Sequence, residues 1–218
     1  MDMNFASKGV AGTGLGLAIG ALGLEALRGN GLGGILGSIA QIISVEKGYE
    51  TAIEVALGNA VLQNIVTETE ADAKRGIEYL KSTNGGIVTF QPLDTVQPSV
   101  FNENLPEWAR TGDSVVKADA KYKNVISRLL GRIIIVDNIN SATSLAKRLN
   151  YRYRIVTMDG QVSNVGGSLT GGSVSKSAGL FTRKGEIEKL KEKLQKLKAE
   201  FETLSAETAK IKENADLL

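Results

Sequence analysis

The C-terminal segment from Glu186 onward has the most regular hydrophobic pattern in the chain. It contains no glycine or proline, and its apolar residues recur at alternating steps of three and four, which is heptad spacing. The seam comprises Ile187, Leu190, Leu194, Leu197, Phe201, Leu204 and Ile211, with the small residues Thr208 and Ala215 as weaker members. Because a lone heptad helix cannot bury its own seam, the pattern predicts a coiled-coil arm over 182–218 that needs a partner helix.

A second pattern occurs twice in the middle of the chain. Each copy begins at a tyrosine, Tyr49 or Tyr122, and reaches a Leu-Gly pair at the same offset. A β-branched strand, a helix with alanines on its apolar face and a second strand follow in both copies. The predicted strands are 63–67 and 86–90 in the first copy and 132–136 and 154–158 in the second. The repeat predicts an α/β protein made of two related subdomains.

The sequence on either side of this repeat, and between its two copies, defines the boundaries of the predicted domains. A glycine-rich segment of uncertain structure (1–31) precedes subdomain I (32–98), and a linker (99–114) leads to subdomain II (115–181). Within subdomain I, residues 35–45 have the composition of a strand. The uncharged run 9–24 is shorter than a bilayer span and dense in glycine, so no membrane segment is expected.

Composition excludes several kinds of chemistry. The 218 residues include no cysteine and no histidine, which removes thiolate nucleophiles, disulfides, imidazole bases and His-ligated metals. The net charge of +2 is too small to indicate nucleic-acid binding by itself. The acidic run 67–72 fits the capped first turn of a helix better than a metal or catalytic site. We therefore expect no catalytic residues, no metal and no cofactor.

One glycine motif leaves an alternative function open. Residues Gly29–Gly34 read GNGLGG and match G-x-G-x-x-G, the phosphate-binding loop of dinucleotide-binding folds. That function requires a strand directly before the glycines and a helix directly after them. A small-molecule or nucleotide-binding α/β domain is thus the alternative, and a helix starting near Gly34 would favour it.

A second glycine motif, NVGGSLTGGS over 164–173, follows the second repeat. As a phosphate cradle it lacks a following lysine, and the apolar residues between its glycines are not needed in a flexible tether. Glycines also allow two backbones to approach closely, so a contact between chains is the favoured interpretation. The basic residues Lys176, Arg183 and Lys184 come next, and either a phosphate-backbone contact or a solvated loop fits them equally.

Taken together, these segments resemble the hinge domain of prokaryotic structural maintenance of chromosomes (SMC) proteins. The resemblance rests on LGGILGSIAQIISVEKGYETAIEVALG (32–58), DAKRGIEYLK (72–81), VTFQPLD (88–94) and LLGRIIIVDNINSATSLAKRL (129–149). It continues through YRIVTMDGQVSNVGGSLTGGS (153–173) and the outgoing heptads.

The resemblance implies a homodimer of a ring-like hinge fold with two pseudo-repeated subdomains. It implies that Gly166, Gly167, Ser168, Gly171, Gly172 and Ser173 lie at the subunit contact, where strands of two molecules join. An antiparallel coiled-coil arm of the same protein would pair with 182–218, and Lys176, Arg183 and Lys184 would contact DNA weakly. The resemblance further implies a cytoplasmic, nucleoid-associated protein for chromosome condensation and segregation. Its ATPase heads would lie elsewhere in a longer chain, so no enzyme activity is expected here.

Overall fold

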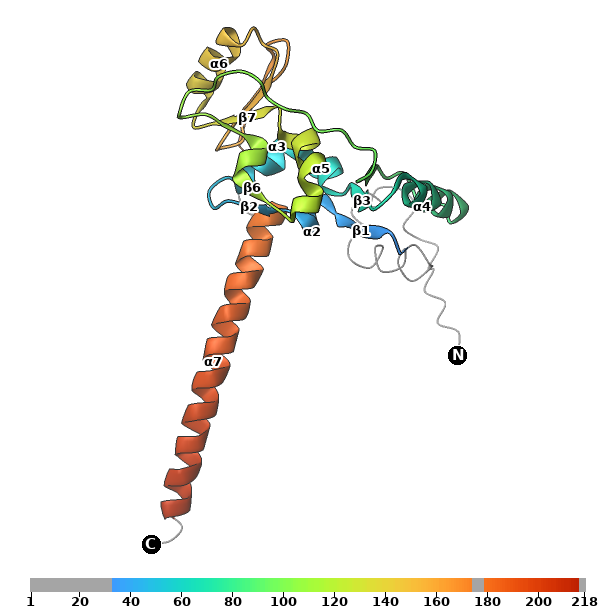
Figure 1. Cartoon of the computed structure of the whole chain (residues 1–218). Coiled ribbons are helices and arrows are strands. Elements are labelled where there is room, and N and C mark those ends of the chain that lie inside the picture. Colours follow the sequence, from blue (N-terminus) through green and yellow to red (C-terminus); the bar gives the residue numbers. More distant parts are fainter. Residues whose placement is uncertain (1–32, 174–178, 216–218) are drawn as a thin grey trace. The chain divides into compact units, whose positions relative to one another are not determined.

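The computed structural model describes residues 33–173 and 179–215. The chain divides into two compact units, Met1–Val174 and Ser175–Leu218 (Figure 1). The first unit holds all the strands of the described residues, and the second holds one long helix, α7 (Leu180–Ala215).

The first repeat forms a small three-stranded sheet. Its elements are α3 (Glu50–Leu62), β3 (Ile65–Thr67), α4 (Glu70–Ser82) and β4 (Phe90–Pro92). β3 and β4 are parallel, as expected for strands joined by a crossover helix, and β1 (Ile35–Ser38) pairs antiparallel with the other side of β3. Because only Ile35 and Ile65 form the buried centre of its hydrophobic cluster, this sheet has a thin core.

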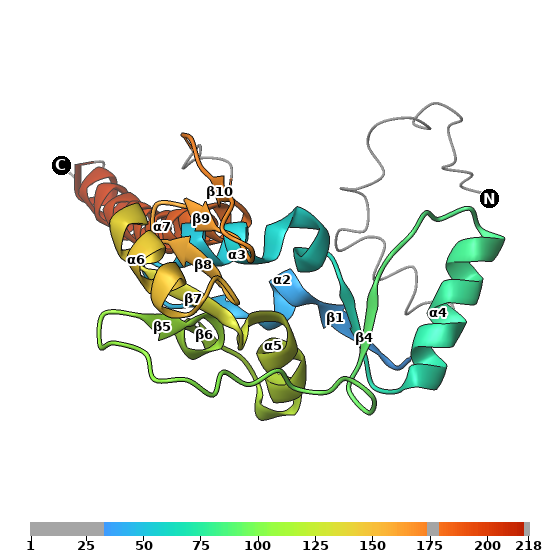
Figure 2. The same cartoon turned by 90° about the horizontal axis from the view of Figure 1, so that it is seen from above.

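The second repeat forms a larger sheet around the same parallel unit. Its elements are α5 (Lys123–Leu130), β7 (Ile133–Val136), α6 (Ile139–Arg148) and β8 (Arg154–Thr157). The sheet order is β10-β9-β8-β7-β5, with β5 (Arg110–Thr111), β9 (Val162–Ser163) and β10 (Leu169–Thr170) added antiparallel (Figure 2). α6 packs on β7, β8 and β9, and its alanines and leucines bury against them. The predicted α/β class and the internal repeat are confirmed.

Two contacts join the repeats within the first unit. The Arg154 guanidinium, from β8, donates to the carbonyl oxygens of Val55 (3.2 Å) and Ala56 (3.3 Å) on α3. These carbonyls precede Gly58, where a φ of +70° interrupts the helix. β2 (Ser44–Val45) pairs antiparallel with β6 (Val116–Lys117), which again crosses from the first half of the sequence to the second. The helix that opens the first repeat therefore packs against the second sheet.

Two predicted strands differ from the structure. Residues 35–45 form β1, the short helix α2 (Ile39–Ile42) and β2 rather than one strand. The backbone N–H of Ser38 donates to the Gln41 side chain at 3.0 Å, an interaction typical of a helix start. The strand predicted at 86–90 begins only at Phe90, as β4, and Gly86 has a φ of +84°, which is not a strand conformation.

The linker predicted at 99–114 contains β5 and most of the 3₁₀ helix η2 (Gly112–Val115). β5 pairs with β7, so this end of the segment belongs to the second sheet. A second 3₁₀ helix, η3 (Ala120–Tyr122), precedes α5. α7 begins two residues before the predicted arm.

The N-terminus of α4 confirms the capping interpretation of the acidic run. The Thr69 hydroxyl accepts from the Asp72 N–H at 3.2 Å, and the Asp72 carboxylate accepts from the Thr69 N–H at 3.1 Å. Arg75 also pairs with this carboxylate. A Cβ added at Gly34 would overlap the Asp72 side chain, so the last glycine of GNGLGG makes room for this cap.

Asp72→Asn is expected to lower the free energy of unfolding at neutral pH by about 1 kcal/mol, as loss of a helix cap does. Hydrogen bonds from Thr69, the larger effect, and from Arg75 hold the pKa of Asp72 below its ordinary 3.8. The stabilisation is therefore complete above the unfolded pKa and is lost as pH falls through the lower folded pKa. Urea titrations at pH 7 and about pH 3 should show the variant's deficit shrinking in acid. Glu78→Gln, on the exposed face of α4, should show no such change.

Candidate functional site

The glycine motif 164–173 forms one edge of the second sheet. β10 lies within it and pairs with β9, which makes β10 the last strand of the order (Figure 2). Within 33–173 and 179–215, no strand pairs with the outer side of β10. An unpaired edge offers its backbone N–H and C=O groups to a strand of another chain.

The first glycine pair makes a tight turn against Tyr151. Gly166 and Gly167 have φ values of +83° and +94°, which residues with a Cβ rarely adopt. The Gly166 N–H donates to the Tyr151 carbonyl at 2.9 Å, and the Gly167 N–H donates to the Asn164 carbonyl at 3.0 Å. A Cβ at Gly167 would lie 3.3 Å from the Tyr151 ring. The turn thus needs glycine for its conformation and, at Gly167, for space.

The second glycine pair is held by one side chain, Gln161. Its amide nitrogen donates to the Gly172 carbonyl at 2.9 Å, and its amide oxygen accepts from the Gly172 N–H at 3.0 Å. The Gln161 side chain therefore bonds Gly172 much as a neighbouring strand would. A Cβ at Gly171 would overlap the Gln161 amide, which explains the first glycine of this pair.

Asn164 connects the turn to β10. Its backbone N–H donates to the Ser168 carbonyl at 2.8 Å, and its side-chain amide donates to the Thr170 hydroxyl at 3.0 Å. Ser168 and Ser173, which the resemblance places at the subunit contact, are both exposed. The segment is thus fixed by internal hydrogen bonds while its outer side stays open.

Apolar side chains are exposed along this same edge. The exposed fraction is 62% for Val165 and 57% for Leu169. Polar residues are the usual occupants of an edge that faces only water. The structure thus brings the six predicted contact residues into one ordered edge with an apolar surface.

Sequence reasoning missed the residues that order this edge. Tyr151 and Gln161 were assigned no role, although they hold the first and second glycine pair respectively. The Gln161–Gly172 bonds span eleven residues, and no local spacing indicates them. Asn164 lies within the motif, two residues before the first glycine pair, so only its role was missed.

α7 presents the predicted heptad seam as one exposed apolar row. The seam side chains that are described, from Ile187 to Leu204, are all exposed, between 51% for Ile187 and 72% for Phe201. Ile211 lies in α7, but its side chain is outside the described residues. A helix with this much exposed apolar surface needs a second helix to cover it.

The three predicted DNA-contacting residues are only partly described. Lys176 lies outside the described residues. Arg183 and Lys184 belong to the first turns of α7, and their side chains are not described.

The alternative nucleotide site lacks the helix that it requires directly after the glycines. Gly34 is followed directly by β1, whereas dinucleotide binding requires a helix there. Residues 29–32 lie outside the described residues.

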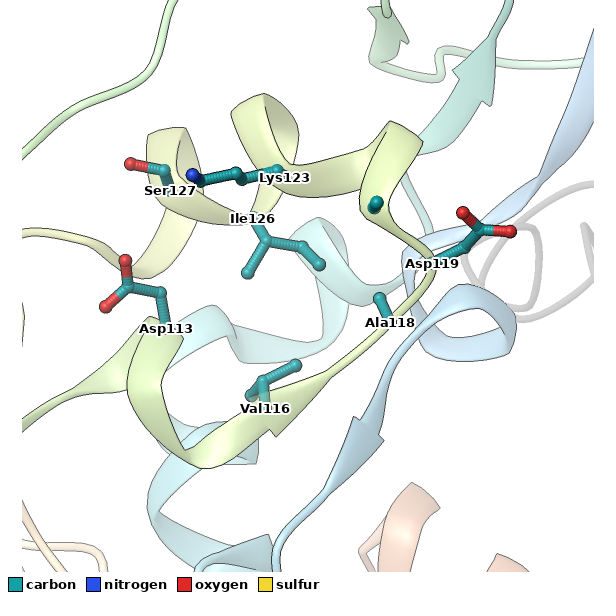
Figure 3. A pocket seen from close by; sticks show the side chains of 8 residues that line it. Asp113, Val116, Ala118, Asp119, Lys123, Ile126 and Ser127 are labelled. Carbon is teal, nitrogen blue, oxygen red and sulfur yellow. The ribbon is translucent and has the colours of Figure 1, made fainter.

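A cavity of about 320 Å³ lies between η2, β6, η3 and α5 (Figure 3). Val116 and Ile126 lie between the carboxylates of Asp113 and Asp119, and Lys123 lies beside them. Two carboxylates disfavour the phosphates of a nucleotide.

Two further kinds of site are absent from the described part of the chain. No group of three or more Asp or Glu side chains could hold a metal ion. No described helix is both long enough and apolar enough to cross a bilayer.

Comparison with known proteins defines the class of this fold as an SMC hinge. A family model described as "SMC proteins Flexible Hinge Domain" matches residues 32–146. The crystal structure of an asymmetric dimer of the Geobacillus stearothermophilus SMC hinge domain has a TM-score of 0.69 and 38% identity, covering 80% of this chain and 73% of that one. The Pyrococcus furiosus Smc hinge domain with an extended coiled coil has a TM-score of 0.60 and 31% identity, covering 84% and 65%.

Among curated proteins, the chain is 42% identical over 165 residues to the chromosome partition protein Smc of Bacillus subtilis. It is 43% identical over 164 residues to that of Desulfitobacterium hafniense. Each alignment covers 72% of this chain and 14% of the relative, so the chain spans about one seventh of the length of these relatives. The chain belongs to the SMC flexible hinge family.

Proposed function

We propose that the chain is the homodimerisation hinge of a chromosome partition protein and joins two coiled-coil arms. The observation that carries this proposal is the open β10 edge, which is ordered by Gln161 and Tyr151 and exposes Leu169. The related Geobacillus hinge domain crystallised as an asymmetric dimer, which supports dimer formation here.

The first sheet is the surface that this edge would meet on a second copy. Its outer strand β4 has no partner on its outer side among the described residues, and Ile87 just before it is fully exposed. Its thin core also leaves Ile77 of α4 half-exposed. Pairing β10 of each copy with the first sheet of the other gives two identical contacts, which close a ring with two-fold symmetry.

The arms follow from the exposed seam of α7. We propose that an antiparallel helix of the same parent protein covers this seam and that the parent carries ATPase heads at the far end of the arms. The parent would act on chromosomes at the nucleoid, and this chain alone would hydrolyse no ATP.

The direct test is the solution mass of the protein, measured by light scattering over a range of concentrations. A mass of twice the 23.1 kDa chain that falls to one chain on dilution supports the proposal. A single-chain mass at every concentration in the series would refute it.

The junction between hinge and arm is expected to contact DNA weakly. Arg183→Gln with Lys184→Gln should lower the affinity for duplex DNA about tenfold at low salt. With two fewer cations on the protein, binding releases fewer of the counterions condensed on the DNA. Gel shifts at about 50 and 200 mM salt measure both the loss and its salt dependence. Lys191→Gln with Lys193→Gln, further along α7, is the matched control. A shift that the junction variant leaves unchanged would contradict this site.

A further inference from the structure

Four basic side chains, none of them among the residues assigned above to DNA, gather at the amino ends of β7 and β8. Arg132 directly precedes β7, Lys147 and Arg148 form the last turn of α6, and Arg152 leads into β8. All four are exposed. Because β7 and β8 are parallel and α6 runs back between them, the fold brings these residues to one end of the sheet. We refer to them as the basic cluster.

Two members of the basic cluster share one aromatic ring. The guanidinium carbon of Arg132 lies 5.0 Å from the centre of the Tyr153 ring, and that of Arg152 lies 5.8 Å from it. Tyr153 is buried, and Phe101 packs edge-on against it with ring centres 4.8 Å apart. The ring is therefore a fixed support that holds two flexible side chains in place.

The loop before β5 contacts two members of the basic cluster, Arg152 and Arg148. The Glu103 carboxylate accepts from the Tyr153 hydroxyl at 2.8 Å and pairs with Arg152 at 2.7 Å. The next residue, Asn104, accepts from Arg148 through its carbonyl at 3.4 Å. Three arginines from separate elements are thus ordered before any ligand arrives, which lowers the entropy lost on binding.

The cluster keeps a surplus of positive charge. Glu103 neutralises Arg152 in part, whereas Arg132, Lys147 and Arg148 make no ion pair with any residue in the described part of the chain. A surface that orders its cations without neutralising them is suited to bind an anion.

We propose that the basic cluster binds the phosphate backbone of duplex DNA, as a second contact separate from the hinge–arm junction. A protein interface needs an apolar centre, yet the one large apolar surface here, Tyr153, lies beneath the arginines. Backbone binding needs only cations spaced along a strand of phosphates, and planar guanidinium groups match phosphate oxygens in pairs. The inference rests neither on the homodimer nor on the junction.

The test is fluorescence anisotropy of the full chain with a labelled duplex of about 30 base pairs, which exceeds the length that the cluster can contact. Lys147→Gln with Arg148→Gln should weaken binding about tenfold at roughly 50 mM salt and reduce the salt slope by about two. Arg148→Lys, which keeps the charge, should retain most of the affinity. Lys81→Gln with Lys117→Gln removes two exposed charges outside the cluster and is the matched control.

The outcomes separate this proposal from the others. Loss of DNA affinity in a variant that keeps its dimer mass, and that adds to the loss from the junction variant, supports the cluster. An unchanged affinity and salt slope overturns it. Conversion to monomers also overturns it, since the cluster would then serve the subunit contact. Displacement of the duplex by polyglutamate as efficiently as by unlabelled DNA overturns it in favour of an acidic protein ligand.

Discussion

Leu169→Glu is expected to convert the dimer into monomers, with a loss of dimer affinity of at least about 100-fold. The leucine is 57% exposed on the β10 edge, where a second chain would cover it. Covering a glutamate at this position buries a charge that has no partner, which costs about 3–5 kcal/mol. Because a symmetric dimer contains the contact twice, both copies of the charge oppose assembly.

Gly171→Val tests the same edge through its backbone. A Cβ at this position overlaps the Gln161 amide, so Gln161 must release Gly172 and the end of β10 loses its support. The result should be a weaker dimer from a chain that still folds, because Gly171 and Gln161 lie outside the hydrophobic core. Gln161→Ala should weaken the dimer in the same direction while leaving space at Gly171.

Light scattering and sedimentation of these variants measure the dimer constant directly. Val100→Glu is the matched control, since Val100 is 62% exposed outside the glycine motif. A Leu169→Glu protein that keeps the dimer constant of the native chain would remove β10 from the interface. A Val100→Glu protein that dissociates equally would show that added charge, rather than its position, is responsible.

The hydrophobic pattern was sufficient to predict the repeated unit of the fold. In each copy a β-branched strand is followed by a helix with alanines on its inner face, and that local information suffices for a parallel strand–helix–strand unit. The two Leu-Gly pairs show the limit of such reasoning. Gly58 is required by its φ of +70°, whereas Gly131 has an ordinary φ and is required because a Cβ would overlap the Ser99 carbonyl. Equal positions in the repeat thus have unequal physical causes.

What the sequence could not predict depends on contacts between distant residues. The resemblance identified the glycines of the edge, but the bonds from Gln161 and Tyr151 that fix them have no periodic signal. The sequence pattern does not predict the basic cluster for the same reason. Arg132 and Arg152 are twenty residues apart and come together only over the Tyr153 ring. The strand predicted at 86–90 was wrong because β propensity does not report the left-handed turn at Gly86.

Arg154→Met is expected to lower the free energy of unfolding by about 2–4 kcal/mol, the largest effect on stability that we expect from one polar contact. Arg154 donates to the Val55 and Ala56 carbonyls of α3, two and three residues before the break at Gly58, where the regular helical hydrogen bonding is interrupted. Methionine keeps most of the side-chain volume but removes both hydrogen bonds to these part-buried carbonyls. The contact also joins the first repeat to the second sheet, so its loss should loosen the two repeats together.

Urea unfolding at one fixed protein concentration measures the effect, because dimerisation makes apparent stability depend on concentration. Arg154→Lys should lie between the native chain and Arg154→Met, since one ammonium cannot hold both carbonyls in the planar geometry of a guanidinium. Arg128→Met on the exposed side of α5 is the matched control and should change stability by less than about 0.5 kcal/mol. If Arg154→Met changes stability no more than Arg128→Met does, the two hydrogen bonds contribute nothing net, and the packing of α3 on β8 alone joins the repeats.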